Sequence, residues 1–163
     1  MNKTYKLNYD SPIGTLALVS NDDAVISIMF NDQNEDVSVP EVVPQVLRNC
    51  YEQIHEYFKG KRQEFTFPYL LKGTPFQEMV WNALIDISYG QTVSYQDIAN
   101  VIKNEKAIRA VGNANGKNKL SIVIPCHRII GSNGKLTGYA GGLWRKEWLL
   151  KHEKNFVVKN KTV

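Results

Sequence analysis

The chain has 163 residues and a mass of 18.6 kDa, enough for one ordinary domain or two small ones. Its residues are 43% hydrophobic, 10% aromatic and 22% charged, which excludes the disordered, collagen-like and membrane classes and predicts a soluble globular protein. The net charge of +4 is unevenly placed: residues 1–72 hold 7 Lys/Arg against 10 Asp/Glu, and residues 73–163 hold 13 against 6. The basic second part suggests a polyanionic partner.

The N-terminus lacks the apolar stretch of a signal peptide, and no apolar run approaches the roughly 20 residues needed to cross a bilayer. We therefore expect a cytoplasmic protein that does not enter membranes. The chain has two cysteines, Cys50 and Cys126, which a reducing compartment would keep as free thiols.

The first thirty residues alternate apolar and polar positions, with turn-forming residues at 10–14 and 20–23, which predicts a small antiparallel meander. Apolar residues then recur at helical spacing between residues 43 and 58, with Gly60 as a stop signal and Cys50 on the apolar stripe. Residues 63–68 predict one more strand. A linker at residues 70–73 then separates an N-terminal scaffold domain, 1–72, from a C-terminal domain, 73–163.

The C-terminal domain opens with two helix starts that carry capping boxes. Thr74 and Gln77 begin a helix predicted to run to about Ser88, and Ser94 and Asp97 begin a second one. A third helical stretch, residues 106–114, follows after a short turn. Two short helices joined by a tight turn favour a helix-turn-helix, although many helical hairpins never touch DNA.

An apolar run, residues 120–124, ends at Pro125 and predicts a buried strand that presents Cys126 at its end. After two glycine-rich loops, a final amphipathic helix is predicted from Leu143, with a loosely held tail from Phe156.

Cys126 is followed directly by His127 and Arg128. A cysteine acts as a nucleophile in its thiolate form, which a neighbouring basic group can favour. In an extended chain adjacent side chains point to opposite faces, so a bridging water or a turn would have to connect Cys126 with His127. A histidine base also needs an orienting acceptor, and either Glu153 or His152 fits the sequence.

The segment 124–130, Ile-Pro-Cys-His-Arg-Ile-Ile, closely resembles the active-site signature of the O6-alkylguanine-DNA alkyltransferases, or methylated-DNA:protein-cysteine methyltransferases. The similarity continues, in the order of that family, through residues 73–77, 93–96, 109–112, Asn118, 139–143 and 146–150. The resemblance implies an α+β fold: a ribonuclease H-like N-terminal domain with a small antiparallel sheet and a helix, then a C-terminal helical winged-helix/helix-turn-helix domain.

The resemblance also implies an activity, namely direct, irreversible and stoichiometric transfer of an alkyl group from O6-alkylguanine in duplex DNA to the protein. O4-alkylthymine is a candidate second substrate. No cofactor is implied, and a monomer is expected. Base flipping is required, because a stacked base cannot reach a thiolate.

Site residues follow from the same resemblance. Cys126 would accept the alkyl group, His127 would take its proton through a water, and Glu153 would hold the imidazole. Tyr95 would donate a proton toward guanine N3. Arg109 would fill the gap left in the duplex by the flipped base, and Asn118 would act as a hinge residue. The guanine pocket would be lined by Ile129, Tyr139 and Ala140.

Two features depart from the family pattern or limit it. Ala140 stands where many members have serine, so any hydroxyl contribution is lost. The zinc site of some members is not expected, because residues 1–72 offer only Cys50 and His55 as Cys or His ligands.

Two other functions are compatible with parts of the sequence. A non-catalytic lesion-binding relative would keep the fold and the arginine but have tryptophan in place of Cys126. A Cys-His hydrolase would need an oxyanion site and would leave the helix-turn-helix and the charge asymmetry unexplained.

Overall fold

The computed structural model describes residues 3–32 and 42–161, with the side chains of 158–161 excepted. The chain divides into two compact units, Met1–Leu71 and Lys72–Val163, each described separately below. Within the described residues no helix is both long and apolar enough to cross a membrane.

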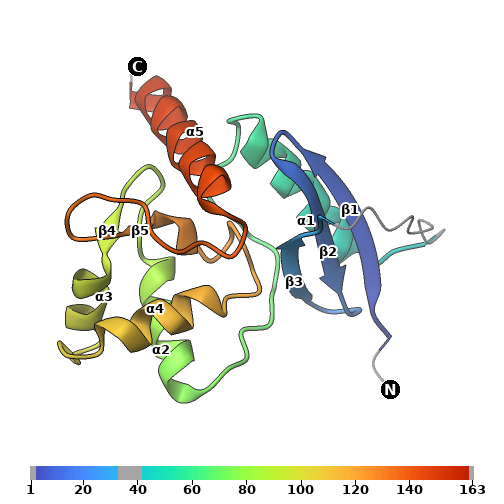
Figure 1. Ribbon diagram of the computed structural model, residues 1–163. Coiled ribbons are helices and arrows are strands. Elements are labelled where there is room, and N and C mark those ends of the chain that lie inside the picture. Colours follow the sequence, from blue (N-terminus) through green and yellow to red (C-terminus); the bar gives the residue numbers. More distant parts are fainter. Residues whose placement is uncertain (1–2, 33–41, 162–163) are drawn as a thin grey trace. The chain divides into compact units, whose positions relative to one another are not determined.

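The first unit is a three-stranded antiparallel sheet in the order β1-β2-β3 with one helix packed against it (Figure 1). Its elements are β1 (Tyr5–Ser11), β2 (Gly14–Ser20), β3 (Val25–Phe30) and α1 (Gln45–Phe58). A two-residue turn joins β1 to β2, and Gly14 closes it with φ +115°, a backbone conformation that glycine adopts without strain. The predicted meander and the helix with its Gly60 stop are confirmed, since Gly60 has φ +75° after α1.

The core of this unit lies between the sheet and the inner stripe of α1. Leu18 of β2 pairs with Leu7 on one side and Ile28 on the other, so the apolar face is continuous across the strands. Cys50 is 0% exposed on the facing stripe of α1. Its burial raises the pKa of the thiol to about 12, which makes it a structural side chain rather than a nucleophile.

The strand predicted at residues 63–68 is wrong. Thr66 donates its backbone N–H to the Gln53 side chain of α1 at 2.9 Å, and Pro68 has no N–H to offer a ladder. The segment instead touches the sheet through a single bridge between Tyr69 and Val25. Phe65 packs against Tyr57 of α1, with ring centroids 5.9 Å apart, and Phe67 packs against Phe65.

The second unit is mainly helical (Figure 1). Its helices are α2 (Pro75–Ile85), α3 (Tyr95–Val101), α4 (Ile108–Gly116) and α5 (Leu143–Lys161). A two-residue parallel pair, β4 (Val93–Ser94) with β5 (Ile129–Ile130), and one 3-10 turn (Cys126–Arg128) complete it. Helix α2 packs against both α3 and α4, which form the helix-turn-helix.

Both predicted capping boxes are present at the starts of α2 and α3. Some boundaries differ from the predictions. Helix α2 ends at Ile85, three residues before the predicted end, and α4 begins at Ile108, two residues after the predicted start. Helix α5 continues to Lys161 where a loose tail was predicted from Phe156.

The strand predicted at residues 120–124 is also wrong, although the run is buried as expected. Leu120, Ile122 and Ile124 are at most 2% exposed, but the backbone forms turns and Ile122 has φ +74°. The side chain of Asn118 bonds Leu120 N–H at 2.9 Å and the Ile124 carbonyl at 2.8 Å. It therefore takes backbone groups that a strand would have paired with a neighbour.

We expect Thr74→Ala to lower the free energy of unfolding by about 1 kcal/mol, because it deletes the side-chain cap of α2. Urea unfolding followed by circular dichroism measures this. Thr92→Ala, the same change at an exposed position outside the helices, is the control. Equal losses in the two variants would contradict a capping role.

Candidate functional site

Cys126 lies in the first position of the 3-10 turn that follows Pro125, and it is 6% exposed. Burial raises the pKa of its thiol, whereas a hydrogen bond from Asn118 and the charge of Lys146 act in the opposite direction. The thiol therefore needs a base to become a nucleophile. The turn also resolves the geometric difficulty of an extended Cys-His pair, since the backbone here is not extended.

Behind the thiol, Glu153 of α5 forms a buried cluster with the two residues that follow Cys126. His127 Nε2 lies 2.6 Å from Glu153 Oε2, and Arg128 Nε donates to Glu153 Oε1 at 2.7 Å. The backbone N–H of Gly90 donates to the same Oε1 at 3.2 Å. Both Glu153 and His127 are 0% exposed.

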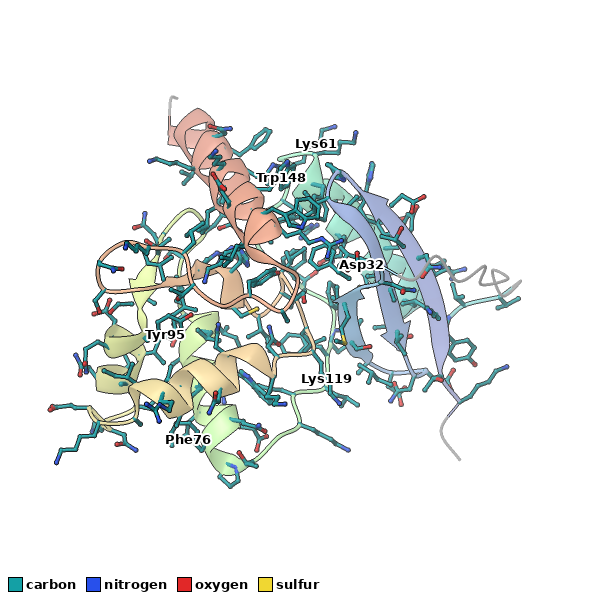
Figure 2. The ribbon with its side chains drawn as sticks, in the orientation of Figure 1. Asp32, Lys61, Phe76, Tyr95, Lys119 and Trp148 are labelled. Carbon is teal, nitrogen blue, oxygen red and sulfur yellow. The ribbon has the colours of Figure 1, made fainter. Side chains whose placement is uncertain are left out.

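The sequence left two acceptors open for His127, and the structure places Glu153 in that position. The neighbouring His152 instead lies between two aromatic rings of α5, with centroids 4.8 Å from those of Trp148 and Phe156. Trp148 is labelled on this helix in Figure 2.

The protonation of this cluster follows from its contacts. Burial alone would raise the pKa of Glu153, but His127 and the Arg128 guanidinium outweigh it and hold that pKa well below its usual range. Burial lowers the pKa of His127 despite the nearby carboxylate, so its imidazole is neutral. An ionised carboxylate only accepts, so the single ring proton is on Nε2 and Nδ1 carries a lone pair. Nδ1 is buried and has no hydrogen-bond partner among the residues that the structure describes.

Asn118 is 7% exposed and organises the turns that lead to Cys126 through the backbone bonds given above. Tyr95, labelled in Figure 2, opens α3, and its hydroxyl lies 3.1 Å from Thr137 Oγ1. Ile129 is buried directly after the turn, Tyr139 is half-buried, and Ala140 and Arg109 are exposed.

Three polar residues of this region were not among the predicted site residues. Arg128 anchors Glu153 and also donates to the Ile87 carbonyl at 2.7 Å. Lys146 is 0% exposed and donates to the Thr137 carbonyl at 2.7 Å, and burial lowers its pKa to about 8. Asn115 is buried at the end of α4. Arg128 could have been found from its place beside the Cys-His pair, but Lys146 and Asn115 lie at helix positions whose orientation depends on packing.

Within residues 3–32 and 42–157 no three His, Cys, Asp or Glu side chains come together as a metal site would require. The arrangement that does exist is a buried thiol followed in the chain by a neutral histidine, whose Nε2 is held by a carboxylate. Such a site belongs to proteins with a cysteine nucleophile, and here it is built into a helix-turn-helix unit.

Comparison with known proteins agrees with this class. Residues 75–155 match the model of the 6-O-methylguanine DNA methyltransferase DNA-binding domain, and residues 4–71 match its ribonuclease-like domain. The chain is 43% identical over 152 residues to a methylated-DNA--protein-cysteine methyltransferase of Methanosarcina acetivorans, covering 91% of this chain and 97% of the relative.

Solved structures give the same result. The O6-methylguanine methyltransferase of Mycobacterium tuberculosis superposes with a TM-score of 0.84 at 41% identity, over 94% of each chain. A structure of the same protein from that organism in complex with DNA has a TM-score of 0.83 at 43% identity, covering 91% of this chain and 92% of that one. The chain belongs to the 6-O-methylguanine DNA methyltransferase family.

We expect Glu153→Gln to lower the free energy of unfolding by about 3–5 kcal/mol, because it leaves the Arg128 charge buried without its partner. The folded-state pKa values of Glu153 and His127 both lie below the unfolded ones, about 4.3 and 6.5. The stability that these two groups contribute is therefore complete above about pH 6.5. This contribution falls as the pH is lowered, through both groups in the wild type and through His127 alone in the variant.

Urea unfolding at several pH values checks both parts of this prediction. Glu147→Gln is the matched control, because Glu147 forms an exposed ion pair with Lys151 on the same helix and should contribute little. A Glu153→Gln variant as stable as this control would show that the cluster does not stabilise the fold.

Proposed function

We propose that this protein repairs alkylated DNA by moving the alkyl group from O6-alkylguanine to Cys126. The observation that carries the proposal is the buried turn in which Cys126 precedes His127. The Nε2 of His127 is held by Glu153, and its Nδ1 has no hydrogen-bond partner among the residues that the structure describes. The names of the relatives, which describe transfer from methylated DNA to a protein cysteine, support it.

In the first step, the Cys126 thiol gives its proton to His127 Nδ1 through a water. The thiolate then attacks the alkyl carbon in line with the bond to O6. The S–C bond forms as the C–O6 bond breaks, and the electron pair of the broken bond moves into the guanine ring. Tyr95 donates a proton toward guanine N3 as that charge develops. Exchange with water then returns a proton to Tyr95 and leaves guanine in its ordinary N1–H form, still bonded to its deoxyribose in the DNA.

The product is a thioether, which offers water no easy leaving group. The other cysteine of the chain, Cys50, is buried in the first unit with a pKa of about 12 and cannot accept the group in turn. Each molecule therefore reacts once. One chain carries every residue of this mechanism, so we infer that it acts as a monomer, and its free thiol fits the reducing cytoplasm.

Recognition of duplex DNA rests on charge and on base flipping. Residues 73–163 hold 13 Lys/Arg against 6 Asp/Glu, which gives the sequence-independent phosphate affinity that a repair protein needs. Arg109 is exposed on α4, the second helix of the helix-turn-helix, where its long planar cation would fill the place of the flipped base. Ile129, Tyr139 and Ala140 would surround the base, and O4-alkylthymine, with the same alkyl-oxygen bond, is a candidate second substrate.

We expect duplex DNA carrying radiolabelled O6-methylguanine to transfer its label to the protein with one label per molecule. Cys126→Ala should lose the transfer completely, since it removes the acceptor sulfur. Cys50→Ala should retain it, and this is the matched control. Denaturing gel electrophoresis followed by autoradiography measures the transfer.

The same experiment separates the alternatives. Tight binding of the modified duplex by the wild type without transfer would favour a lesion-binding protein. Transfer that persists in Cys126→Ala would place the acceptor elsewhere.

We expect Arg109→Ala to slow repair of duplex DNA by 10-fold or more, about 1.4 kcal/mol in the barrier, while reaction with free O6-benzylguanine changes little. A free base needs no flipping, so only the duplex reaction depends on the arginine. Arg48→Ala, which removes an exposed arginine from α1, is the charge control. Single-turnover rates on the two substrates check this, and equal losses on both would show that Arg109 is not the flipping element.

A further inference from the structure

Thr137 contacts the hydroxyl of Tyr95 in two ways. Its Oγ1 donates to the Tyr95 hydroxyl oxygen at 3.1 Å, and its main-chain carbonyl accepts the Tyr95 proton at 3.3 Å. Thr137 lies in the loop between β5 and α5, whereas Tyr95, labelled in Figure 2, opens α3. The loop thus places a hydroxyl donor against the oxygen of the group that the proposed mechanism uses as its acid.

An anchor inside the unit holds Thr137 in this place, although the residue itself is exposed. Lys146 of α5 is 0% exposed, and its Nζ donates to the Thr137 carbonyl at 2.7 Å. A buried, closely packed side chain has little freedom to move, and a hydrogen bond from a charged group is among the strong ones. The bond therefore fixes the backbone of Thr137, and with it the direction of the threonine side chain.

The two bonds to Tyr95 act differently on its proton. A phenol has one proton to donate and an oxygen that also accepts, and the Thr137 hydroxyl occupies the accepting side. The phenolic proton is left with a carbonyl at 3.3 Å, longer than the usual O–H···O distance of about 2.7–2.8 Å. That carbonyl already accepts the shorter bond from Lys146. The proton is therefore weakly held and available to a better acceptor.

We propose that Thr137 is a positioning residue, whose hydroxyl holds the Tyr95 phenol as the proton donor to guanine N3. The phenolic oxygen gains negative charge as its proton moves to N3, and the hydrogen bond from Thr137 strengthens with that charge. Thr137 keeps its own proton throughout. This inference rests on the proposed function, because it needs a guanine to leave beside Tyr95.

The experiment measures single-turnover rates at saturating protein on a duplex with radiolabelled O6-methylguanine. Thr137→Val keeps the branched shape and deletes the hydroxyl, so we expect transfer to slow about tenfold, as for one hydrogen bond to a charged oxygen. Thr137→Ser keeps the hydroxyl and should react at close to the wild-type rate. Thr92→Val, the same change at an exposed position before β4, should leave the rate unchanged.

A second duplex separates this role from a structural one. O6-Methyl-3-deazaguanine has carbon in place of N3, so it takes no proton there, and Thr137→Val should react with it as fast as the wild type does. In a Tyr95→Phe background, Thr137→Val should likewise cause no further loss on the guanine duplex, because the phenolic oxygen is gone. The transferred label stays on the protein, so long time courses measure slow rates as well.

A threonine that only shapes the loop would slow both duplexes equally in Thr137→Val, with or without the phenol. That outcome overturns the inference, as does an unchanged rate of Thr137→Val on the guanine duplex or a loss of rate in Thr137→Ser. A Tyr95→Phe variant as fast as the wild type overturns it too. Thr137→Ala provides the same comparison if circular dichroism shows that the valine variant does not fold.

Failure of the proposed function would look different again. In that case the wild type transfers no label from the guanine duplex. A wild type that transfers the label at a rate unaffected by Thr137 leaves the repair function intact and removes only the role of this residue.

Discussion

The structure around Cys126 depends on one buried carboxylate. Glu153 accepts bonds from the Arg128 guanidinium and the Gly90 N–H, and it fixes the proton of His127. It therefore joins α5, the 3-10 turn and the segment before β4 at one point. A charge buried in this way is tolerated because each of its bonds is made, and the permanent cation of Arg128 keeps it ionised when His127 is neutral. Without that charge, the imidazole ring of His127 would no longer be held in one orientation.

This arrangement separates protection of the thiol from its activation. Burial raises the pKa of Cys126, so the resting thiol resists oxidants and other thiol-reactive compounds in solution. In the proposed mechanism His127 is the base that activates the thiol, and the charge of the buried Lys146 lowers the thiol's pKa. A protein of this kind uses its acceptor cysteine once. If the cysteine were a reactive thiolate at rest, it could be modified before the protein bound DNA, and the protein could then no longer accept an alkyl group.

Local signals in the sequence predicted local structure well. The capping boxes of Thr74 and Ser94 were correct because each depends on residues three apart in the chain. The apolar run 120–124 has the pattern of a buried strand but does not form one. Hydrophobic patterning cannot show that the Asn118 side chain bonds the backbone groups of this run. The short β4–β5 pair is absent from the prediction for a similar reason, as two residues have no periodicity.

The candidate site shows the same limit. The adjacent Cys-His pair was visible as a motif, but the choice between His152 and Glu153 depends on how α5 is rotated, because adjacent helical residues point about 100° apart. The structure selects Glu153 for the imidazole. The contact of Asn115 with Cys126 could not be predicted from the sequence. Its partner is the main-chain carbonyl of Cys126, and every residue type at position 126 would present the same carbonyl.

The two-residue ladder between β4 and β5 determines which segments of the second unit can change in length. Ser94 pairs with Ile130, so Tyr95, the next residue, is placed relative to a strand that begins directly after the Cys126 turn. A slip of one residue would turn these side chains to the opposite face. The turn between α3 and α4 and the tip of the loop 131–134 are not paired in this ladder. We therefore expect insertions there to leave the distance between the Tyr95 hydroxyl and the Cys126 thiol unchanged. Loops of different length could therefore replace the present ones in this unit, while the pairing of Ser94 with Ile130 keeps Tyr95 in place.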